Sequence, residues 1–88
     1  MNILFTSDGC PGCTAIKNFV YMEKLSGYLK MVDVKFNHEY GYNVGYLDGK
    51  EVEGECPVSA VPALYQADEG AILYGYDEIK RVLKHGNK

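Results

Sequence analysis

Cys10-Pro11-Gly12-Cys13 places two cysteines two residues apart, between the apolar run Ile3–Phe5 and a segment with helical periodicity. Proline is favoured at the first position inside a helix, so we expect Cys10 to cap a helix that begins at Pro11. A helix N-terminus carries unpaired amides and a positive partial charge, which stabilise a thiolate. Because the thiolate is the nucleophile in thiol–disulfide exchange, the motif predicts that chemistry.

The two cysteines have different predicted roles. A capping side chain accepts a hydrogen bond from the amide two or three residues further on, here that of Gly12 or Cys13. Gly12 also has no side chain to obstruct an incoming disulfide. We therefore expect Cys10 to be the exposed thiolate that attacks, and the sheltered Cys13 to resolve the mixed disulfide.

Length and composition limit the class of protein. The 88 residues predict a single domain, 1–88, and 47% hydrophobic with 24% charged residues is typical of a globular chain. A net charge of -3 without a basic stripe argues against nucleic acid as a partner. No apolar run approaches the roughly 20 residues of a membrane span. Three cysteines and no recognisable secretory signal favour the reducing cytoplasm. We also expect a monomer.

Hydrophobic periodicity predicts an α/β chain. The first half contains an expected buried strand over Asn2–Thr6, a helix whose apolar stripe reaches Leu25 and which Gly27 ends, and a second strand over Met31–Phe36. Met22 belongs to the same expected stripe. A strand, a helix and a strand in this order form a right-handed parallel unit.

The C-terminal part predicts a hairpin and a helix. Ala63–Gln66 and Ala71–Tyr74 are expected strands, and the turn Asp68–Gly70 makes them antiparallel. Asp77 is the expected N-cap of the last helix, whose inward residues are Ile79, Val82 and Leu83. We therefore expect a mixed central sheet of about four strands, flanked by helices.

The middle of the chain, residues 37–60, is predicted as a small hairpin. Tyr40, Tyr42, Val44 and Tyr46 alternate with other residues, Asp48-Gly49 is a hairpin turn, and Glu51–Glu53 continues the alternation. A short helix is the alternative, and the glycines in this stretch count against it. The tyrosines either pack within the strands or form a face that binds a partner.

Three stretches of the chain resemble the glutaredoxin and thioredoxin superfamily, and within it the small glutaredoxin-like redoxins. They are Phe5–Cys13, Ala60–Leu64 and Tyr74–Ile79. The resemblance implies a thioredoxin-like fold in which the Val61-Pro62 bond is cis and Pro62 packs against the cysteine pair, with the hairpin in place of the family's second helix. The chain departs from the usual motifs at Gly12, where glutaredoxins carry tyrosine, and it lacks the tryptophan of thioredoxins.

The resemblance also implies an activity and its site residues. It implies a thiol–disulfide oxidoreductase that reduces protein disulfides, with ribonucleotide reductase as a customary client of the family. No bound cofactor is implied, and the reductant is glutathione, as a co-substrate, or a thioredoxin reductase. Pro11, Gly12, Val61 and Pro62 would support the cysteines. By motif position, the residues that would bind glutathione are Val61, Gly75, Tyr76 and Asp77, although Asp77 is equally explained as a helix cap.

Two alternatives use the same cysteines to bind metal. Cys10, Cys13 and Cys56, with His38 or His85, could supply the four ligands of a zinc site. Structural zinc sites usually pair two Cys-x-x-Cys motifs, whereas Cys56 stands alone. An iron–sulfur carrier that uses Cys10 and glutathione is the other alternative. If Cys56 does not bind a metal, we expect it to be either a buried cysteine with no part in the reaction or a second redox thiol.

Overall fold

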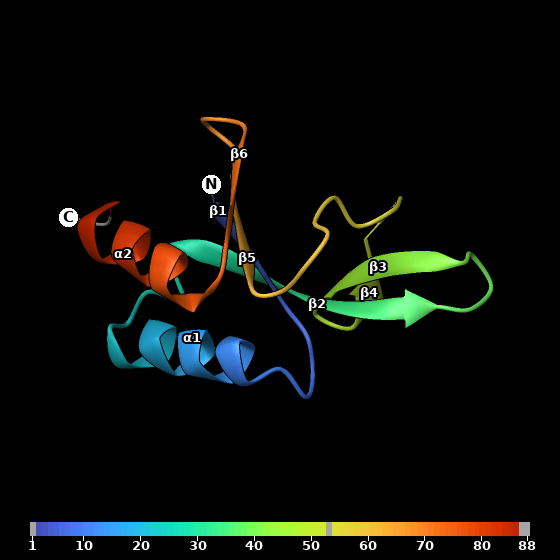
Figure 1. The fold of residues 1–88 in the computed structure, drawn as a ribbon, viewed down its shortest axis with the longest axis horizontal. Coiled ribbons are helices and arrows are strands. Elements are labelled where there is room, and N and C mark those ends of the chain that lie inside the picture. Colours follow the sequence, from blue (N-terminus) through green and yellow to red (C-terminus); the bar gives the residue numbers. More distant parts are fainter. Residues whose placement is uncertain (1, 53, 87–88) are drawn as a thin grey trace.

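The computed structural model of the chain describes residues 2–52 and 54–86. Figure 1 shows the path of the chain through six strands and two helices of this part of the molecule. In chain order the elements are β1 (Asn2–Thr6), α1 (Pro11–Met22), β2 (Leu29–Asn37), β3 (Tyr42–Leu47), β4 (Lys50–Glu51), β5 (Ala63–Gln66), β6 (Ala71–Tyr74) and α2 (Tyr76–Gly86).

The strands form one mixed sheet in the order β4-β3-β2-β1-β5-β6. Strands β1 and β2 are parallel, as the strand–helix–strand pattern predicts, and all other neighbours are antiparallel. The α/β class and the mixed sheet are confirmed. The prediction of about four strands is wrong, because the described residues form a six-stranded sheet in which β3 and β4 extend the outer edge of β2.

Two turns bring β3 and β4 to that edge. The side-chain oxygen of Asn37 accepts hydrogen bonds from the amides of Glu39 and Tyr40 at 2.9 and 3.0 Å, which reverses the chain after β2. Asp48 and Gly49 have φ values of 53° and 80°, the signs that a tight type I′ hairpin turn requires. The hairpin prediction is thus confirmed, except that Glu53, its last residue, lies outside the described residues.

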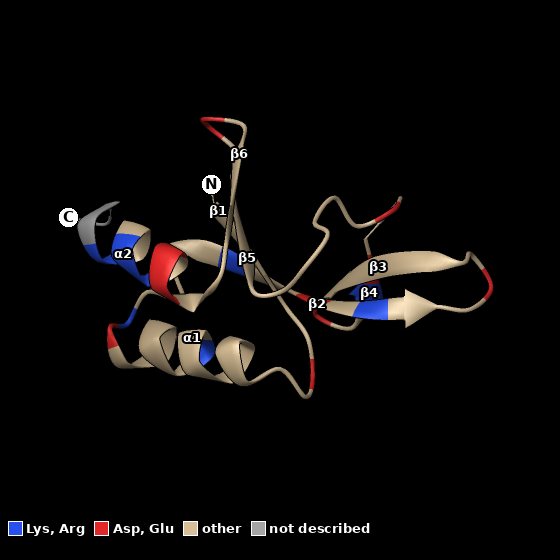
Figure 2. Cartoon of the chain, in the orientation of Figure 1, with Lys and Arg blue, Asp and Glu red and all other residues tan. Residues whose placement is uncertain are grey.

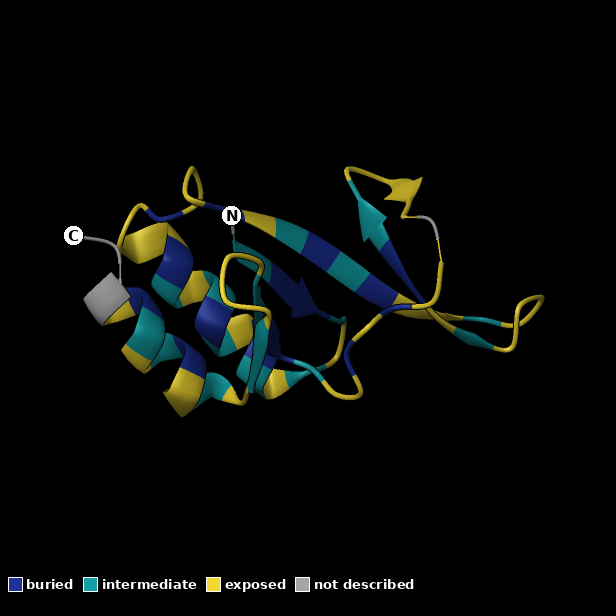
Figure 3. Ribbon diagram, turned by 90° about the horizontal axis from the view of Figure 1, so that it is seen from above, coloured by how far each residue is buried: buried dark blue, intermediate teal, exposed yellow. Residues whose placement is uncertain are grey.

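Both helices cover the same face of the sheet. Leu4 of β1 and Leu64 of β5 are register partners, and both are fully buried in one cluster with apolar residues of α1 and α2. Ile79 and Leu83 of α2 are buried there, as the helical pattern predicts. A second cluster on the opposite face contains Phe5 and is covered by residues 56–58. Figure 3 shows the alternation of buried and less buried positions along β2 that these two faces produce.

Helix α1 ends at Met22, before the predicted end at Gly27. Lys24 adopts a left-handed conformation with φ 57°, and the amide of Leu25 bonds to the carbonyl of Val20 at 2.9 Å, as in a Schellman cap. Leu25 therefore reaches the core from the cap rather than from the helix. Met22 is 80% exposed, so its assignment to the apolar stripe is wrong.

The molecule is elongated, with extents of 41 × 27 × 21 Å. Figure 1 shows that the helices lie at one end and the β2–β3–β4 unit projects at the other. Figure 2 shows acidic residues in the first turn of α2 and basic residues later in that helix, which is the favourable order for the helix dipole. Within the described residues, neither helix has the length and apolar character needed to cross a membrane.

Candidate active site

Cys10 occupies the N-cap of α1, at the end of the loop that follows β1. Its backbone is extended, and its carbonyl accepts a bond from the amide of Thr14 at 3.0 Å. Its Sγ accepts a bond from the amide of Cys13 at 3.2 Å, as the capping argument predicts, and Pro11 takes the first helical position. Cys10 is only partly buried, so an incoming disulfide can reach the sulfur that the helix terminus stabilises.

Cys13 is the sheltered member of the pair, with an exposed fraction of 1%. Burial raises the pKa of its thiol to about 11, and a hydrogen bond with the Cys10 side chain contributes in the same direction. A hydrogen bond to the backbone of Ser7 and the charge of Lys17 oppose this shift in pKa. Cys13 therefore keeps its proton at neutral pH, as its predicted role as the second thiol requires.

The loop around Pro62 closes over the dithiol. The Val61-Pro62 peptide bond is cis, as the resemblance implies. The thiol of Cys10 approaches the carbonyl oxygen of Val61 at 3.8 Å. A Cβ on Gly12 would lie 3.3 Å from Cδ of Pro62, tighter than an ordinary contact, so the glycine allows the helix terminus and the proline to approach closely. Val61 thus meets the sulfur of Cys10, although the two residues are 51 positions apart in the chain.

The start of α2 adjoins the same loop. The amide of Gly75 donates to the carbonyl of Pro62 at 3.1 Å, while the carbonyl of Gly75 accepts from the amide of Ile79 at 3.1 Å. Gly75 therefore occupies the N-cap position, and the prediction of Asp77 as the cap is wrong. Asp77 is exposed in the first turn of the helix, where a negative charge is favourable. The ring of Tyr76 lies under the ammonium group of Lys80, at 5.5 Å.

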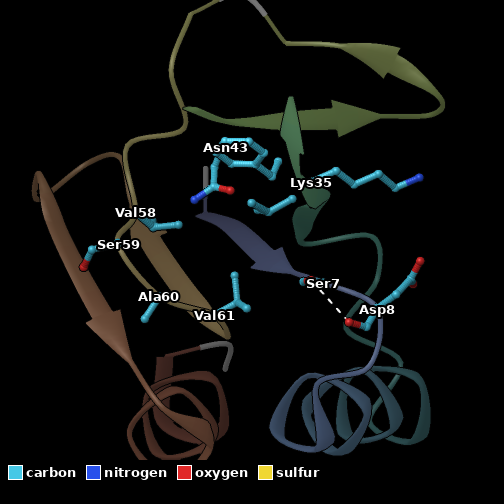
Figure 4. Close-up of a pocket in the computed structure, with 10 residues that line it drawn as sticks. Ser7, Asp8, Lys35, Asn43, Val58, Ser59, Ala60 and Val61 are labelled. Atoms are coloured by element: carbon cyan, nitrogen blue, oxygen red, sulfur yellow. Dashed lines mark hydrogen bonds between the residues drawn. The ribbon is translucent and has the colours of Figure 1, made fainter. Parts of the chain in front are cut away.

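A groove of about 520 Å³ opens beside the Pro62 loop. Figure 4 shows residues from the loop after β1 on one side of it and residues of the 58–61 segment on the other. The residues that line it are Ser7, Asp8, Val34, Lys35, Phe36, Asn43, Val58, Ser59, Ala60 and Val61. Of the suggested glutathione positions, Val61 lines this groove, and Gly75, Tyr76 and Asp77 do not.

Sequence reasoning missed several of these residues. Lys17 follows Cys13 by one helical turn, and that spacing could have indicated its effect on the thiol. The contribution of Ser7 depends on the path of the loop after β1, which no local pattern specifies. Phe36 belongs to the predicted second strand, but that it lines a groove with Val58 depends on the tertiary arrangement of β2 and the segment before β5, which no local pattern specifies.

The structure does not gather the residues suggested for a zinc site. Cys56 is buried in the second core cluster, with an exposed fraction of 8%, and its amide bonds to the carbonyl of Asn43 at 2.9 Å. His38 lies in the exposed turn after β2, with its ring against Phe36. In the part of the chain that the structure describes, no three His, Cys, Asp or Glu side chains form a metal-binding group. The side chain of His85 lies outside that part.

Comparison of the chain with family models, with curated proteins and with solved structures gave no match. The chemistry of the site must therefore be argued from its geometry. A reachable sulfur on a helix N-terminus, one turn before a buried thiol of raised pKa, has the components that thiol–disulfide exchange requires.

Proposed function

We propose that this chain is a thiol–disulfide oxidoreductase with a thioredoxin-like fold, and that it reduces disulfide bonds in client proteins. The observation that carries the proposal is the position of Cys10. Its Sγ is partly exposed and accepts the Cys13 amide at the helix terminus, while Cys13 itself is buried. Two thiols with such different surroundings are suited to successive roles in one reaction.

The arrangement of the elements supports the proposed fold. The parallel pair β1 and β2, the antiparallel pair β5 and β6, and two helices on one face agree with the pattern that the resemblance implies. The β3–β4 hairpin and the segment after it stand where that family carries its second helix. We propose a cytoplasmic location, where the reducing environment keeps thiols such as Cys10 and Cys13 reduced.

In the first proposed step, the Cys10 thiolate attacks one sulfur of the client disulfide. A new bond forms between Cys10 Sγ and that sulfur, the client S–S bond breaks, and the second client sulfur leaves as a thiolate that takes up a proton. The carbonyl of Val61 borders the sulfur, and the ring of Pro62 packs against the neighbouring Gly12, so both limit the direction of approach.

In the second step, Cys13 loses its proton and attacks Cys10 Sγ. The mixed disulfide breaks, the first client sulfur leaves as a thiol, and the dithiol has passed two electrons to the client. Once Cys10 is bonded to the client, its hydrogen bond and charge no longer raise the pKa of Cys13. Burial, the largest cause of the raised pKa, remains, so the mixed disulfide removes only the part of the shift that Cys10 contributes.

An external reductant must restore the dithiol. Two molecules of glutathione, or a thioredoxin reductase, would supply the two electrons. Val61 and Gly75, which flank Pro62, are the residues that we propose for contact with glutathione. Ribonucleotide reductase is a candidate client by family resemblance alone.

Trapping the mixed disulfide tests the proposal. Reduced Cys13→Ser, mixed with an oxidised client protein and no other reductant, should accumulate a covalent adduct through Cys10 that mass spectrometry detects. The wild-type protein should instead release reduced client and form its own Cys10–Cys13 disulfide. If Cys10→Ser forms the adduct as readily as Cys13→Ser, the assigned roles are wrong.

A further inference from the structure

The sheet has an unfilled strand position next to the dithiol. Strand β1 stops at Thr6, opposite Asp33, whereas β2 continues to Asn37. On the other side of β1, strand β5 starts only at Ala63. Beyond Thr6, therefore, the sheet position between β2 and residues 58–61 holds no strand.

The groove described above occupies this position. Its lining includes the consecutive residues Val34–Phe36 and the consecutive residues Val58–Val61. Figure 4 shows Lys35, Ser7 and Asp8 on one side and Val58, Ser59, Ala60 and Val61 on the other. Side chains along an extended segment alternate between two faces, so one face cannot supply three residues in a row. The backbone edge of β2 itself must therefore border the groove.

That edge has no strand partner. In the described residues the neighbours of β2 are β1 and β3, and the pairing with β1 ends at Asp33. Alternate residues of a strand direct their N–H and C=O groups to opposite sides. Phe36 pairs with Asn43, whose carbonyl accepts the amide of Cys56 and so points away from β2. Phe36 therefore directs its own N–H and C=O groups away from β3 and toward the groove, while Lys35 and Asn37 direct theirs toward β3. Across the groove, the backbone of Ala60 makes no hydrogen bond with any described residue. The carbonyl oxygen of Val61 is approached only by the Cys10 thiol within the same part of the chain.

Apolar side chains accompany the open edge. Val34 and Val58 are buried at the base of the groove. Phe36 follows Val34 by two positions, on the same face of β2, and it is 55% exposed despite its size. An exposed aromatic ring beside unpaired backbone groups is typical of a surface that binds an extended peptide.

We propose that this groove binds an extended segment of the client protein, which adds to the open edge of β2 in the position that β1 leaves empty. The segment would contact Phe36 and present its cysteine sulfur to Cys10. This inference rests on the proposed oxidoreductase function, and it names the substrate class as an extended, apolar polypeptide around the reactive cysteine. Exchange at the sulfur follows the two steps given above.

Paired substrates with the same leaving thiol test the groove. One is a peptide of about eight residues, longer than a typical strand, with alternating valines and a central cysteine joined by a disulfide to 2-mercaptoethanol. The other is 2-hydroxyethyl disulfide. For Phe36→Ala, the ratio of kcat/KM for the peptide to kcat/KM for the small disulfide should fall at least about fivefold. Tyr28→Ala removes another exposed aromatic ring, 64% exposed, and should leave the ratio as in the wild type.

The outcomes separate the two proposals. If the wild type accelerates reduction of both substrates and Phe36→Ala has the same ratio as Tyr28→Ala, the groove proposal is wrong and the oxidoreductase proposal stands. If the wild type accelerates neither reduction, the oxidoreductase proposal itself fails.

Amide hydrogen exchange gives a second, direct test. Cys13→Ser is linked through Cys10 either to the peptide or to 2-mercaptoethanol alone. Exchange at the amide of Phe36 should be slower in the peptide adduct, because a new backbone hydrogen bond protects it. The amides of Lys35 and Asn37, which face β3, are internal controls. Equal exchange in the two adducts would overturn strand addition at this edge.

Discussion

Cys10 and Cys13 belong to one turn of chain, yet their surroundings differ in the way that sequential attack requires. Cys10 takes the cap of α1 because Pro11 starts the helix and needs no amide partner there. Cys13 lies on the inner face of the first turn, so burial raises the pKa of its thiol to about 11. The helix start alone therefore produces one reachable and one protected sulfur.

The raised pKa of Cys13 predicts a loss of stability at alkaline pH. The unfolded chain, with an ordinary value of 9.0, releases this proton before the folded chain, whose pKa is about 11. Each increase in pH between these values favours the unfolded state, by up to about 2–3 kcal/mol in total. Under reducing conditions, the difference in unfolding free energy between the wild type and Cys13→Ser should fall across this range.

Urea denaturation at a series of pH values measures this difference. Cys13→Ser is the control, because it keeps all the titrating groups except Cys13. A difference that stays constant with pH would show that the folded state does not hold the Cys13 proton more tightly than the unfolded chain.

At the same scale, the sequence predicted the cap at Cys10 but misplaced the cap of α2. Asp77 was a reasonable expectation because aspartate is a preferred N-cap. However, Gly75 bonds to Pro62 through its amide, and its φ of 91° turns the chain directly into the helix. A tertiary contact that the local pattern does not contain therefore sets the start of α2.

At the scale of elements, the strands, the helices and the pairs β1–β2 and β5–β6 were largely predictable, while the pairing of β3 with β2 was not. Alternation and the turn Asp48-Gly49 predict β3 and β4, because both signals are local. Whether that hairpin joins the main sheet depends on the length of β2 and on the turn that follows Asn37. The strand count was wrong for this reason.

Gly45 of β3 lies close to the side chain of Val32 in β2. A Cβ at this position would lie 2.6 Å from Cγ1 of Val32, a buried residue, and 3.9 Å from Cβ of Val52. Gly45→Ala should therefore lower the free energy of unfolding by about 1–3 kcal/mol, as overpacking does. Gly27→Ala is a matched control, because a Cβ there meets nothing within 4 Å.

Urea denaturation of the two glycine variants tests this packing. The double variant Gly45→Ala/Val32→Ala should lose less stability than the sum of the losses of the two single variants, because Val32→Ala removes the atom that the new methyl group meets. Equal stability of the two glycine variants would mean that β3 does not pack against Val32 as described.

At the scale of the whole molecule, the same extension that lengthens the sheet creates the groove. Both helices cover one face, and a short segment that includes Cys56 and Val58 covers part of the other. Strands β2 and β3 continue beyond the end of β1, so the dithiol opens onto an edge rather than onto a closed surface. The sequence predicted the dithiol and the Pro62 loop, but it could not predict this edge, which exists only once three strands are in register.

The reductant depends on the shape of the whole molecule, because either glutathione or a thioredoxin reductase must fit beside Cys10. If Val61 and Gly75 contact glutathione, the oxidised protein should be reduced by glutathione faster than by a thioredoxin reductase with its nicotinamide cofactor. Thiol release measured with each reductant, at equal concentrations of the oxidised protein, checks this expectation. Faster reduction by the reductase would contradict the proposed glutathione contacts.

The most direct test of the central claim is the rate of insulin reduction by dithiothreitol, followed by turbidity. The wild type should accelerate the reaction, Cys56→Ala should do so to a similar extent, and Cys10→Ser should leave the uncatalysed rate. An uncatalysed rate with the wild type, or acceleration that persists in Cys10→Ser, would contradict the account that Cys10 at the start of α1 is the attacking thiol of an oxidoreductase.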